Sequence, residues 1–467
     1  MKLNTKQTIK IGFAFLAICA FWQMYNSVVP LMLTETFSLN EMYSGIIMAA
    51  DNVLALFLLP LFGGISDRCK SKIGKRKPFI FCGTLASVFL MLMVPWMDNQ
   101  FFASPSQTKQ VIFICVLGCL LVAMGTYRSP AVALMPDVTP KPLRSKANAI
   151  INLMGAVGGI MYLLIASVMY SQKRTEGLKH VDYMPLFLVV AGIMIVALII
   201  IMLAVDEVQL NSEMKRLEAE YERAAEVAEE SVTAPAPEGE TTEKAAAEKA
   251  ISNVSKSEEK LPTEVKKSLI FLLFSISLWF IGYNAVETWF TTYANEMWNM
   301  SLGGASMCLT VATGGAILSY IPVGQIASKI GRKKTIKGGV ILLGSCFFVA
   351  FLYTLFSHKF HPALYGLFLL VGLAWAAINV NSLPMVLEMC KGSDVGKFTG
   401  YYYAFSMAAQ IITPILAGFL LHKIGYATLF PYAAVFVAGS FATMCMVKHG
   451  DSKVEAKKGL DAFDVDD

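Results

Sequence analysis

"GGISDRCKSKIGKRKPFI", residues 63–80, carries six Lys and Arg residues between two long apolar stretches. The chain around it is 55% hydrophobic, with a mean hydropathy of +0.56, and only 16% of its residues are charged. Soluble domains are roughly 25% charged. A soluble protein would not surround a basic cluster with so much apolar sequence. This stretch therefore indicates a loop between two segments that lie in a lipid bilayer.

Twelve apolar stretches are long enough, at roughly 20 residues each, to cross the hydrocarbon layer. Backbone polar groups in lipid must pair within their own segment, so runs of this length are helices. The sequence predicts an all-α membrane protein, and we expect the first stretch to be a retained helix because it is too long for a signal-peptide core. The twelve spans are expected near 9–33, 44–64, 78–97, 110–135, 146–170, 184–205, 267–293, 303–325, 336–357, 362–388, 398–421 and 426–447.

The loop charges predict the orientation of these spans. With the N-terminus in the cytoplasm, nineteen Lys and Arg residues fall in loops or ends on that side and six fall on the other. Positive residues concentrate in cytoplasmic loops. We therefore expect a multi-pass protein of the plasma (cytoplasmic) membrane with both termini in the cytoplasm. The net charge of +5 is explained by contact with the lipid bilayer and needs no nucleic acid partner.

Cysteine and histidine usage argues against disulfides, metals and cofactors. The chain has nine cysteines without a CxxC pair, and its five histidines fall in predicted loops or tails. Neither a disulfide framework nor a zinc site is indicated. We expect no metal, no cofactor and no catalytic residues, because no cluster of catalytic type is visible. The chain is therefore not expected to be an enzyme.

Residues 206–266 differ from the rest in being charged, poor in aromatic residues and interrupted by Pro-Ala-Pro. This composition is typical of a solvated linker, while its Glu, Lys and Ala content favours a helix over part of it. We expect a cytoplasmic linker that is partly helical or disordered. It divides the chain into a six-helix half at 1–205, a second at 267–447 and a cytoplasmic tail at 448–467.

The two halves carry an internal repeat. The loop after span two runs from Gly63 through Asp67 to "GKRK", and the loop after span eight runs from Gly324 through Ser328 to "GRKK". A weaker echo places Arg128 nine residues before Asp137 and Asn379 nine residues before Glu388. Twin six-helix halves describe a transporter whose site lies between them at the bilayer midplane.

The repeated loop has a mechanical interpretation. Gly63 allows two helices to approach closely, and Asp67 can accept from backbone N–H groups at a neighbouring helix start and pair with a cation. Such a latch would form in one state and break in the other; the alternative is a topology anchor only. The gating residues expected on this basis are Gly63, Asp67, Arg68, Gly74, Arg76, Asp137 and Glu388.

The loop spacing and the twin halves resemble the major facilitator superfamily. Within it, the spacing from Arg68 to Gly74 followed by "KRKPFI" resembles the plant sucrose transporters and solute carrier family 45. "PAVALMPDVTPKPLRSKANAIINLMGAVGG" (130–159) is similar to the same families, and "DNVLALFLLPLFGGISD" and "WFIGYNAVETWF" resemble bacterial members. The resemblance implies the major facilitator fold and proton-coupled uptake of sucrose or a related sugar.

Two positions depart from the family patterns. Sucrose transporters place an arginine two residues after the span-four proline, where this chain has Val132; its own arginine, Arg128, precedes Pro130. Sodium/melibiose carriers place paired aspartates in span two, where this chain has Ala55 and Leu59. Sodium coupling through such a pair is therefore not expected.

Ionisable residues inside spans are costly and are functional by default. Asp51 lies roughly 24 Å of helix before Asp67, past the midplane toward the outside, at about 1.5 Å per residue. As the one acid deep in the first half, with apolar neighbours, it is the expected proton carrier; Glu287 is the rival. Arg128 would clamp sugar hydroxyls or hold a counter-charge. Structural roles for all three remain the alternative.

Sugar recognition needs amides for hydroxyl contacts and an aromatic face for the C–H surface. Polar residues also hold membrane helices together, so about half of the candidates are expected to serve packing. The substrate-binding candidates are Trp22, Gln23, Tyr25, Asn26, Arg128, Asn152, Tyr283, Asn284, Trp375, Asn379, Asn381 and Gln410.

The sequence leaves several function classes open. Buried acids with many neutral amides favour proton-coupled symport of a sucrose-like disaccharide or related glycoside, by a monomer. The alternatives are an exporter of hydrophobic small molecules, which would have an aromatic cavity with few amides, and a glycoside carrier coupled to sodium. A sensor or enzyme would carry an effector domain or a catalytic cluster, and neither is visible.

Overall fold

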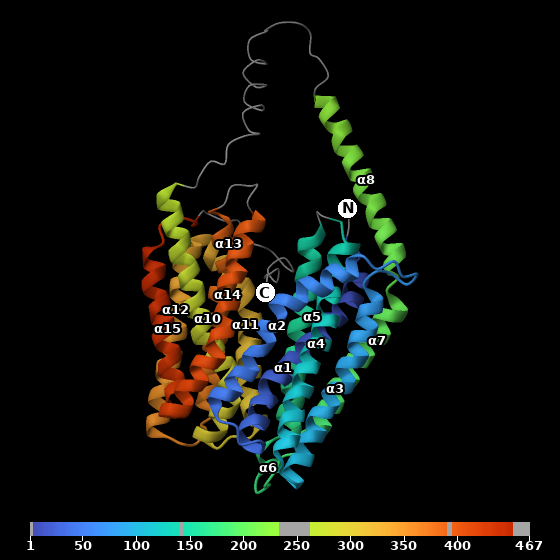
Figure 1. Cartoon of the computed structure of the whole chain (residues 1–467). Coiled ribbons are helices and arrows are strands. Elements are labelled where there is room, and N and C mark those ends of the chain that lie inside the picture. The colour runs from blue at the N-terminus through green and yellow to red at the C-terminus, as the bar shows by residue number, and fades with distance from the viewer. Residues whose placement is uncertain (1–2, 141–142, 233–261, 390–394, 452–467) are drawn as a thin grey trace.

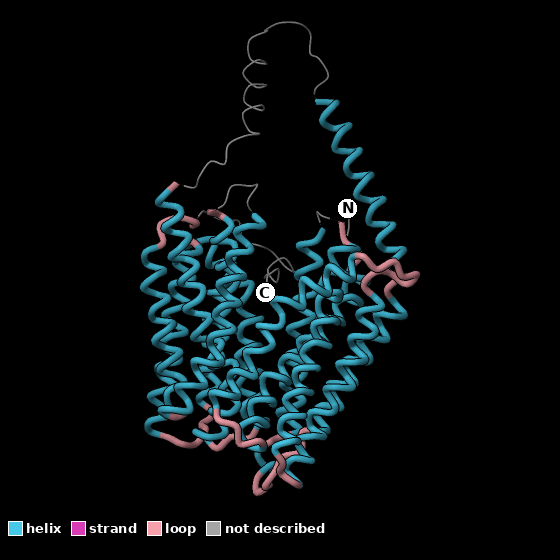
Figure 2. The backbone as a smooth tube through the Cα atoms, viewed as in Figure 1, coloured by secondary structure: helices cyan, strands magenta, loops and turns pink. Residues whose placement is uncertain are grey.

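The computed structural model describes residues 3–140, 143–232, 262–389 and 395–451. This part of the chain is helical and its elements are joined by short loops, with no strand among the described residues (Figure 2). Twelve of its helices are long and apolar enough to cross a membrane. The predicted all-α membrane fold with twelve transmembrane helices is confirmed. Of the predicted linker, residues 233–261 lie outside the described residues.

The helices follow one another with few interruptions (Figure 1). Those of the first half are α1 (Thr5–Leu31), η1 (Met32–Thr36), α2 (Glu41–Asp67), α3 (Lys77–Ala103), α4 (Gln107–Val138), α5 (Arg144–Met169), α6 (Gln172–Thr175) and α7 (Met184–Ala204). The linker contributes α8 (Glu207–Val232). Those of the second half are α10 (Thr263–Trp298), α11 (Leu302–Ile330), α12 (Arg332–Phe356), α13 (Ala363–Leu387), α14 (Val395–Ile424), η3 (Tyr426–Thr428) and α15 (Leu429–Met446).

Several helices extend beyond the apolar runs that predict them, α3 among them. Span three was expected to end at residue 97, but α3 continues to Ala103. The polar triplet at 98–100 is therefore helical and not a loop. Its first residue, Asp98, is completely buried, so packing around that side chain overrides the local signal for a turn.

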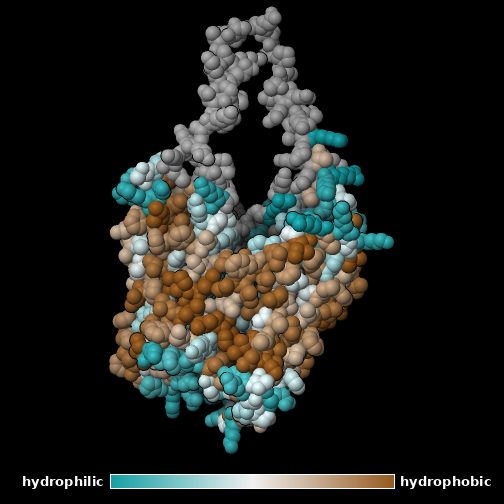
Figure 3. Space-filling model, in the orientation of Figure 1, coloured by the Kyte–Doolittle hydropathy of each residue, from teal (hydrophilic) through white to brown (hydrophobic). Residues whose placement is uncertain are grey.

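Both described ends of the chain lie on one face of the bundle, which we call the termini face; the opposite end is the far face (Figure 1). Helix α8 projects from the termini face. The outer surface is hydrophobic around the middle and hydrophilic at both ends, and it is hollowed between the two halves at the termini face (Figure 3). This distribution fits a bundle that is surrounded by lipid.

Each half has its own apolar core. One core draws on residues between 11 and 205, with Leu302 from the other half, and the second on residues between 269 and 447. The halves meet where α2 packs on α14, α5 on α11 and α1 on α10. Glycines permit the closest approaches: a Cβ atom on Gly158 of α5 would lie 2.1 Å from the Leu16 carbonyl oxygen of α1.

We predict that Gly158→Val lowers the thermal stability of the purified protein. The new side chain would meet backbone on α1, which cannot move aside, and overpacking of this kind costs about 1–3 kcal/mol. Gly192→Val on α7 is the matched control, because nothing lies within 4 Å of a Cβ atom there. Equal melting temperatures for the two variants would contradict this packing of α5 on α1.

Candidate functional site

Four of the predicted site residues come together near the middle of the first half. The Arg128 guanidinium of α4 lies over the Trp22 ring of α1, 5.7 Å from its centroid, and Trp22 meets Tyr25 edge to face at 5.6 Å. The Asp51 carboxylate of α2 interacts electrostatically with Arg128 and with Tyr25. A cation, a carboxylate and two aromatic rings from three helices therefore form one cluster, which we call the Arg128 cluster.

Two donors in this cluster are not used by the protein. Neither Trp22 Nε1 nor the Tyr25 hydroxyl, both buried, has a hydrogen-bond partner. Leaving a buried donor unsatisfied costs roughly 1–3 kcal/mol. Asp51 is half-buried and accepts from the Asn52 N–H at 2.6 Å. The neighbours of Asp51 are thus polar and charged, in contrast to the apolar surroundings expected from the sequence.

The second half supplies a flat aromatic surface. Tyr283 of α10 stacks on Trp375 of α13, with ring centroids 3.7 Å apart and planes inclined by 8°. Phe280 meets the edge of Trp375 at 5.4 Å and holds that ring in place. Beside Tyr283, Asn284 is buried and its Nδ2 has no hydrogen-bond partner. We call Tyr283 and Trp375 the aromatic pair.

The remaining candidates are less uniform. Asn381 donates to the Ala377 carbonyl one turn earlier, at 2.9 Å, which is a packing role. Asn379 is buried and its backbone oxygen accepts from Ser382. Half-buried positions hold the other five candidates, namely Gln23 and Asn26 on α1, Asn152 on α5, Glu287 on α10 and Gln410 on α14.

Arg76 lies at the centre of the predicted latch on the termini face. Its guanidinium is bonded to Asp67 and to the Ser66 hydroxyl, to Asp137 Oδ2 at 2.7 Å and to the Gly63 carbonyl at 3.2 Å. The side chain is only 5% exposed, so the charge is neutralised where water cannot screen it. Asp137 thus pairs with Arg76 and not with Arg128.

Glu207, the first residue of α8, has the role that the sequence analysis gave to Asp67. Its carboxylate accepts from the N–H groups of Lys75, Arg76 and Lys77 at 2.8–3.1 Å. A carboxylate is stabilised there by the positive end of a helix dipole, as at the start of α3. The expectation that Asp67 caps this helix is wrong, because its side chain is engaged by Arg76.

The other predicted gating residues fit around these contacts. Gly74 has a φ of +115°, and a Cβ atom there would lie 2.2 Å from Glu207 Oε2; the backbone and the space both require glycine. Gly63 faces Ser129 of α4, 3.1 Å from where its Cβ would be. Arg68 is exposed.

The second half repeats this arrangement with different residues. Arg332 pairs with Glu388, as Arg76 pairs with Asp137. Asp451 accepts from the Lys333 N–H at 3.1 Å, as Glu207 caps α3. Lys77 donates its ammonium group to the end of α7 and Lys333 to the Val447 carbonyl after α15.

Contacts between the halves gather at the far face. Asn295 of α10 donates to Glu35 of η1, and His422 Nδ1 of α14 lies 3.2 Å from Glu41 Oε2 of α2. The Gly303 N–H donates to the Tyr170 carbonyl at 2.9 Å. A Cβ atom on Gly45 of α2 would lie 2.2 Å from the Pro414 carbonyl oxygen of α14. The far face is closed by backbone that touches backbone.

Sequence reasoning missed Glu207, Asp451 and this set of far-face contacts. An acid within five residues of the ends of α7 and α15 is a repeat that the sequence does display, so the two caps were discoverable. Asp51 was taken as the one deep acid of the first half, but Asp98 is more fully buried, at 0% exposed. It was missed because residue 98 lay just beyond the predicted end of span three.

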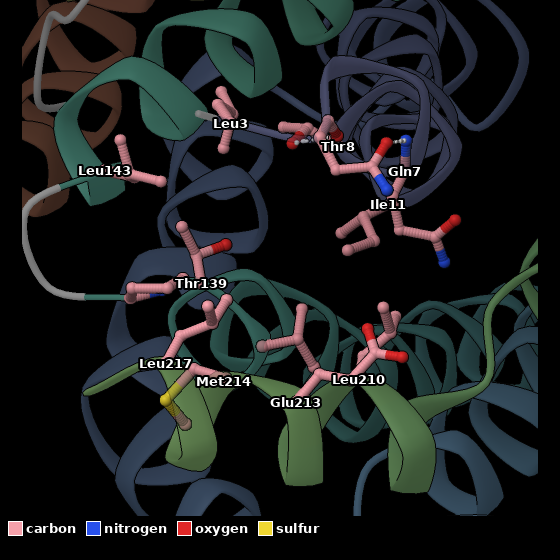
Figure 4. A pocket seen from close by; sticks show the side chains of 13 residues that line it. Leu3, Gln7, Thr8, Ile11, Thr139, Leu143, Leu210, Glu213, Met214 and Leu217 are labelled. Atoms are coloured by element: carbon pink, nitrogen blue, oxygen red, sulfur yellow. Dashed lines mark hydrogen bonds between the residues drawn. The ribbon is translucent and has the colours of Figure 1, made fainter. Parts of the chain in front are cut away.

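Two cavities lie beside α8 on the termini face. One, of about 150 Å³, is enclosed by the start of α1, the turn after α4 and the apolar side of α8, with Leu210, Met214 and Leu217 pointing into it (Figure 4). It is smaller than the roughly 300–1,000 Å³ usual for ligand sites. The other, of about 540 Å³, is lined by charged residues around Asp137 and Glu207. No predicted substrate residue lines either cavity.

Comparison with curated proteins finds sugar transporters with limited overlap. The chain is 27% identical over 139 residues to "Sucrose transport protein SUC3" of Arabidopsis thaliana, which covers 27% of this chain and 23% of that protein. It is 26% identical to human "Solute carrier family 45 member 3" (30% and 26% covered) and to the "General alpha-glucoside permease" of Schizosaccharomyces pombe (34% and 29% covered). The matches thus span about a quarter of each relative's length.

Solved structures show the same fold over most of the chain. The nucleoside transporter NupG matches with a TM-score of 0.63 at 14% identity, covering 95% of this chain and 100% of that one. A bacterial homologue of the iron transporter ferroportin, in an inward-facing state, matches with a TM-score of 0.65 at 10% identity, covering 95% and 99%. The family model "Major Facilitator Superfamily" matches residues 11–340 and 295–462. The chain belongs to the major facilitator superfamily and is a transporter, not an enzyme.

Proposed function

We propose that this transporter carries a sucrose-like disaccharide or related glycoside together with a proton, by alternating access. The observation that carries the proposal is that the first half supplies the Arg128 cluster and the second half supplies the aromatic pair. Trp22 and Tyr25 of the cluster lie on α1 and Tyr283 of the pair lies on α10, and these two helices contact each other across the two halves. The sucrose transport and glucoside permease names of the relatives support the same substrate class.

A sugar ring has hydroxyl edges and an apolar C–H face, and the two groups of residues suit these two surfaces. The unpaired donors Trp22 Nε1, Tyr25 OH and Asn284 Nδ2 would bond hydroxyl oxygens. The exposed part of the aromatic pair would stack on the C–H face. A neutral solute is consistent with these three donors, which carry no charge.

Asp51 and Arg128 supply the proposed coupling. When Asp51 is ionised, its charge interacts with Arg128. A proton on Asp51 removes that attraction and frees the guanidinium to bond a sugar hydroxyl. Proton and sugar would thus bind together, and the loss of one would weaken the binding of the other. Sodium coupling through paired aspartates is disfavoured by Ala55 and Leu59, which occupy those positions in span two.

The two faces of the bundle suggest how access alternates. Contacts between the halves close the far face, while the surface is hollowed at the termini face. The Arg76 and Arg332 networks hold each half together, so each would rock as one body. We take the termini face as cytoplasmic, from the charge bias of the loops, in a monomer in the plasma membrane.

Uptake into proteoliposomes tests this function. A panel of radiolabelled sugars is offered with and without an inward proton gradient. A disaccharide or glycoside should accumulate only with the gradient, and replacing the gradient with sodium should not restore accumulation. Export of hydrophobic dyes without uptake of any sugar would contradict the proposal.

We predict that Asp51→Asn abolishes accumulation against a gradient, because the variant is fixed in the neutral form. Exchange of labelled for unlabelled sugar between equilibrated compartments should survive, since exchange needs no net release of a proton. Loss of exchange would identify Asp51 as a substrate ligand or structural acid. Unchanged accumulation would move the coupling role to Glu287.

Asp67→Asn should reduce transport while the protein stays folded and inserted, because one of the two carboxylates that neutralise Arg76 is lost. Removing one partner of a buried ion pair lowers the stability of a protein by about 3–5 kcal/mol. Because the Asp67 carboxylate is exposed, we expect a loss of stability at or below the lower end of that range. Sugar affinity should change little. Lys72→Gln in the same exposed loop is the control. A collapse of sugar affinity with an unchanged conformational balance would contradict the gating role.

For orientation, a cysteine introduced at exposed Ser104 should react in intact cells with a thiol reagent that does not cross membranes. One at exposed Ala219 on α8 should react only after the cells are permeabilised. Both are compared in a background without the nine native cysteines. Labelling of residue 219 in intact cells would reverse the proposed orientation.

A further inference from the structure

Near the far face, Asp98 of α3 is buried without a matching charge. Its side chain is 0% exposed, and neither carboxylate oxygen makes a hydrogen bond of normal geometry. The nearest polar groups are the Thr36 hydroxyl of η1 and His180 Nε2, at 3.4 Å from Oδ2. An ionised carboxylate in such a place is costly unless it is paired.

The state of His180 decides whether Asp98 has a counter-ion. Asn99 donates from Nδ2 to Asp182 at 2.7 Å, and Asp182 also accepts from the Met184 N–H. The amide orientation is therefore fixed, and Asn99 Oδ1 faces His180 Nε2 at 2.8 Å. Since that oxygen only accepts, Nε2 carries the hydrogen.

The surroundings of His180 favour its neutral form. The Phe102 ring stacks on the imidazole at 4.3 Å, and burial lowers the pKa of His180 below its ordinary value, although the Asp182 carboxylate acts in the opposite direction. A neutral imidazole gives Asp98 no charge to pair with.

The other charged groups around Asp98 are either acidic or solvent-exposed cations. Glu35 of η1 and Asp182 both repel a negative charge on Asp98, and Tyr183 is a further neighbour. Lys109 of α4 is exposed and bonds the Gln100 and Ser104 carbonyls. The cations of the segment that carries His180 are likewise exposed, namely Lys173, Arg174 and Lys179.

The segments that pack over Asp98, residues 170–183 and η1, form hydrogen bonds with the second half. Residues 170–183 include His180. The same segment accepts two hydrogen bonds from the second half: the Ser301 N–H donates to Gln172 Oε1 at 2.7 Å, and the Gly303 N–H donates to the Tyr170 carbonyl. Glu35, beside Asp98, is bonded to Asn295. Opening the far face breaks all three contacts, so residues 170–183 and η1 are no longer held over Asp98 by the second half.

We propose that Asp98 is a proton-binding site that is occupied while the far face is closed and is emptied when that face opens to water. In the closed state burial and two acidic neighbours favour the neutral acid, whereas in the open state a hydrated carboxylate ionises. Low pH outside therefore stabilises closure, and closure weakens as the pH rises. This site rests on alternating access but not on the identity of the solute or on Asp51.

Closure can be followed by double electron–electron resonance, which measures the distance distribution between two spin labels. The labels are placed at exposed Ser106 and His358, in far-face loops of the two halves. The protein carries Asp51→Asn, so that this carboxylate does not contribute, and no sugar is present. As the pH falls from about 8 to 5.5, the ratio of closed to open molecules should rise. For one proton the rise is at most about tenfold per pH unit. Adding Asp98→Asn should keep the far face closed and remove the pH dependence.

Asp182→Asn is the matched control and should retain the pH dependence, because residue 182 still accepts from Asn99. The proposal is overturned if the slope persists in Asp98→Asn, or if it disappears instead in Glu35→Gln or His180→Gln. An infrared difference spectrum gives a second readout: the carbonyl band of a protonated acid should be present in the protein that retains Asp98 and absent in the Asp98→Asn variant. No difference in that band would also overturn it.

Discussion

The buried charge of Arg76 is the interaction on which the organisation of the first half depends. One guanidinium joins Asp67 at the end of α2 to Asp137 at the end of α4, while its own backbone N–H is held by Glu207 of α8. Four helices thus meet at one residue at the start of α3. A charge with so little exposure is stable only with its partners in place, so these helix ends cannot separate independently.

The same logic explains why the two faces of the molecule differ. On the termini face the ionic networks of Arg76 and Arg332 each lie within a half, which leaves the halves able to part. On the far face the halves meet through glycines, backbone carbonyls and a few polar side chains, such as Glu41 with His422. Contacts of this kind join the two halves, whereas each ionic network lies within one half. The proposed rocking motion follows from this division.

Much of this organisation was predictable. Twelve spans and the twin loops gave the fold, because hydrophobic length and basic loops are physical requirements of a membrane helix bundle. The repeated loops led to Arg76 and Asp137 as predicted gating residues, and the two form an ion pair; their gating role stays a prediction. The Arg128 cluster was foreseen residue by residue, but not its assembly: Trp22, Asp51 and Arg128 come from three helices, and their proximity depends on how those helices pack.

Other features lay outside the reach of sequence patterns. Asp98 follows an apolar run and begins a polar triplet, which locally favours a loop; burial beneath His180 keeps it helical and hidden. Glu207 begins a charged segment whose composition indicates only a linker, and its role appears when the start of α3 is seen beside it. Residues with unusual environments are those that local composition describes least well.

The central claim is that a sugar and a proton cross together. The most direct measurement follows pH with a membrane-impermeant dye inside lightly buffered proteoliposomes, starting from equal pH and no sodium, when the transported sugar is added outside. We predict that the interior acidifies as the sugar enters, and that the rates of acidification and sugar entry rise together with sugar concentration. Entry of sugar without any change in internal pH would contradict the account.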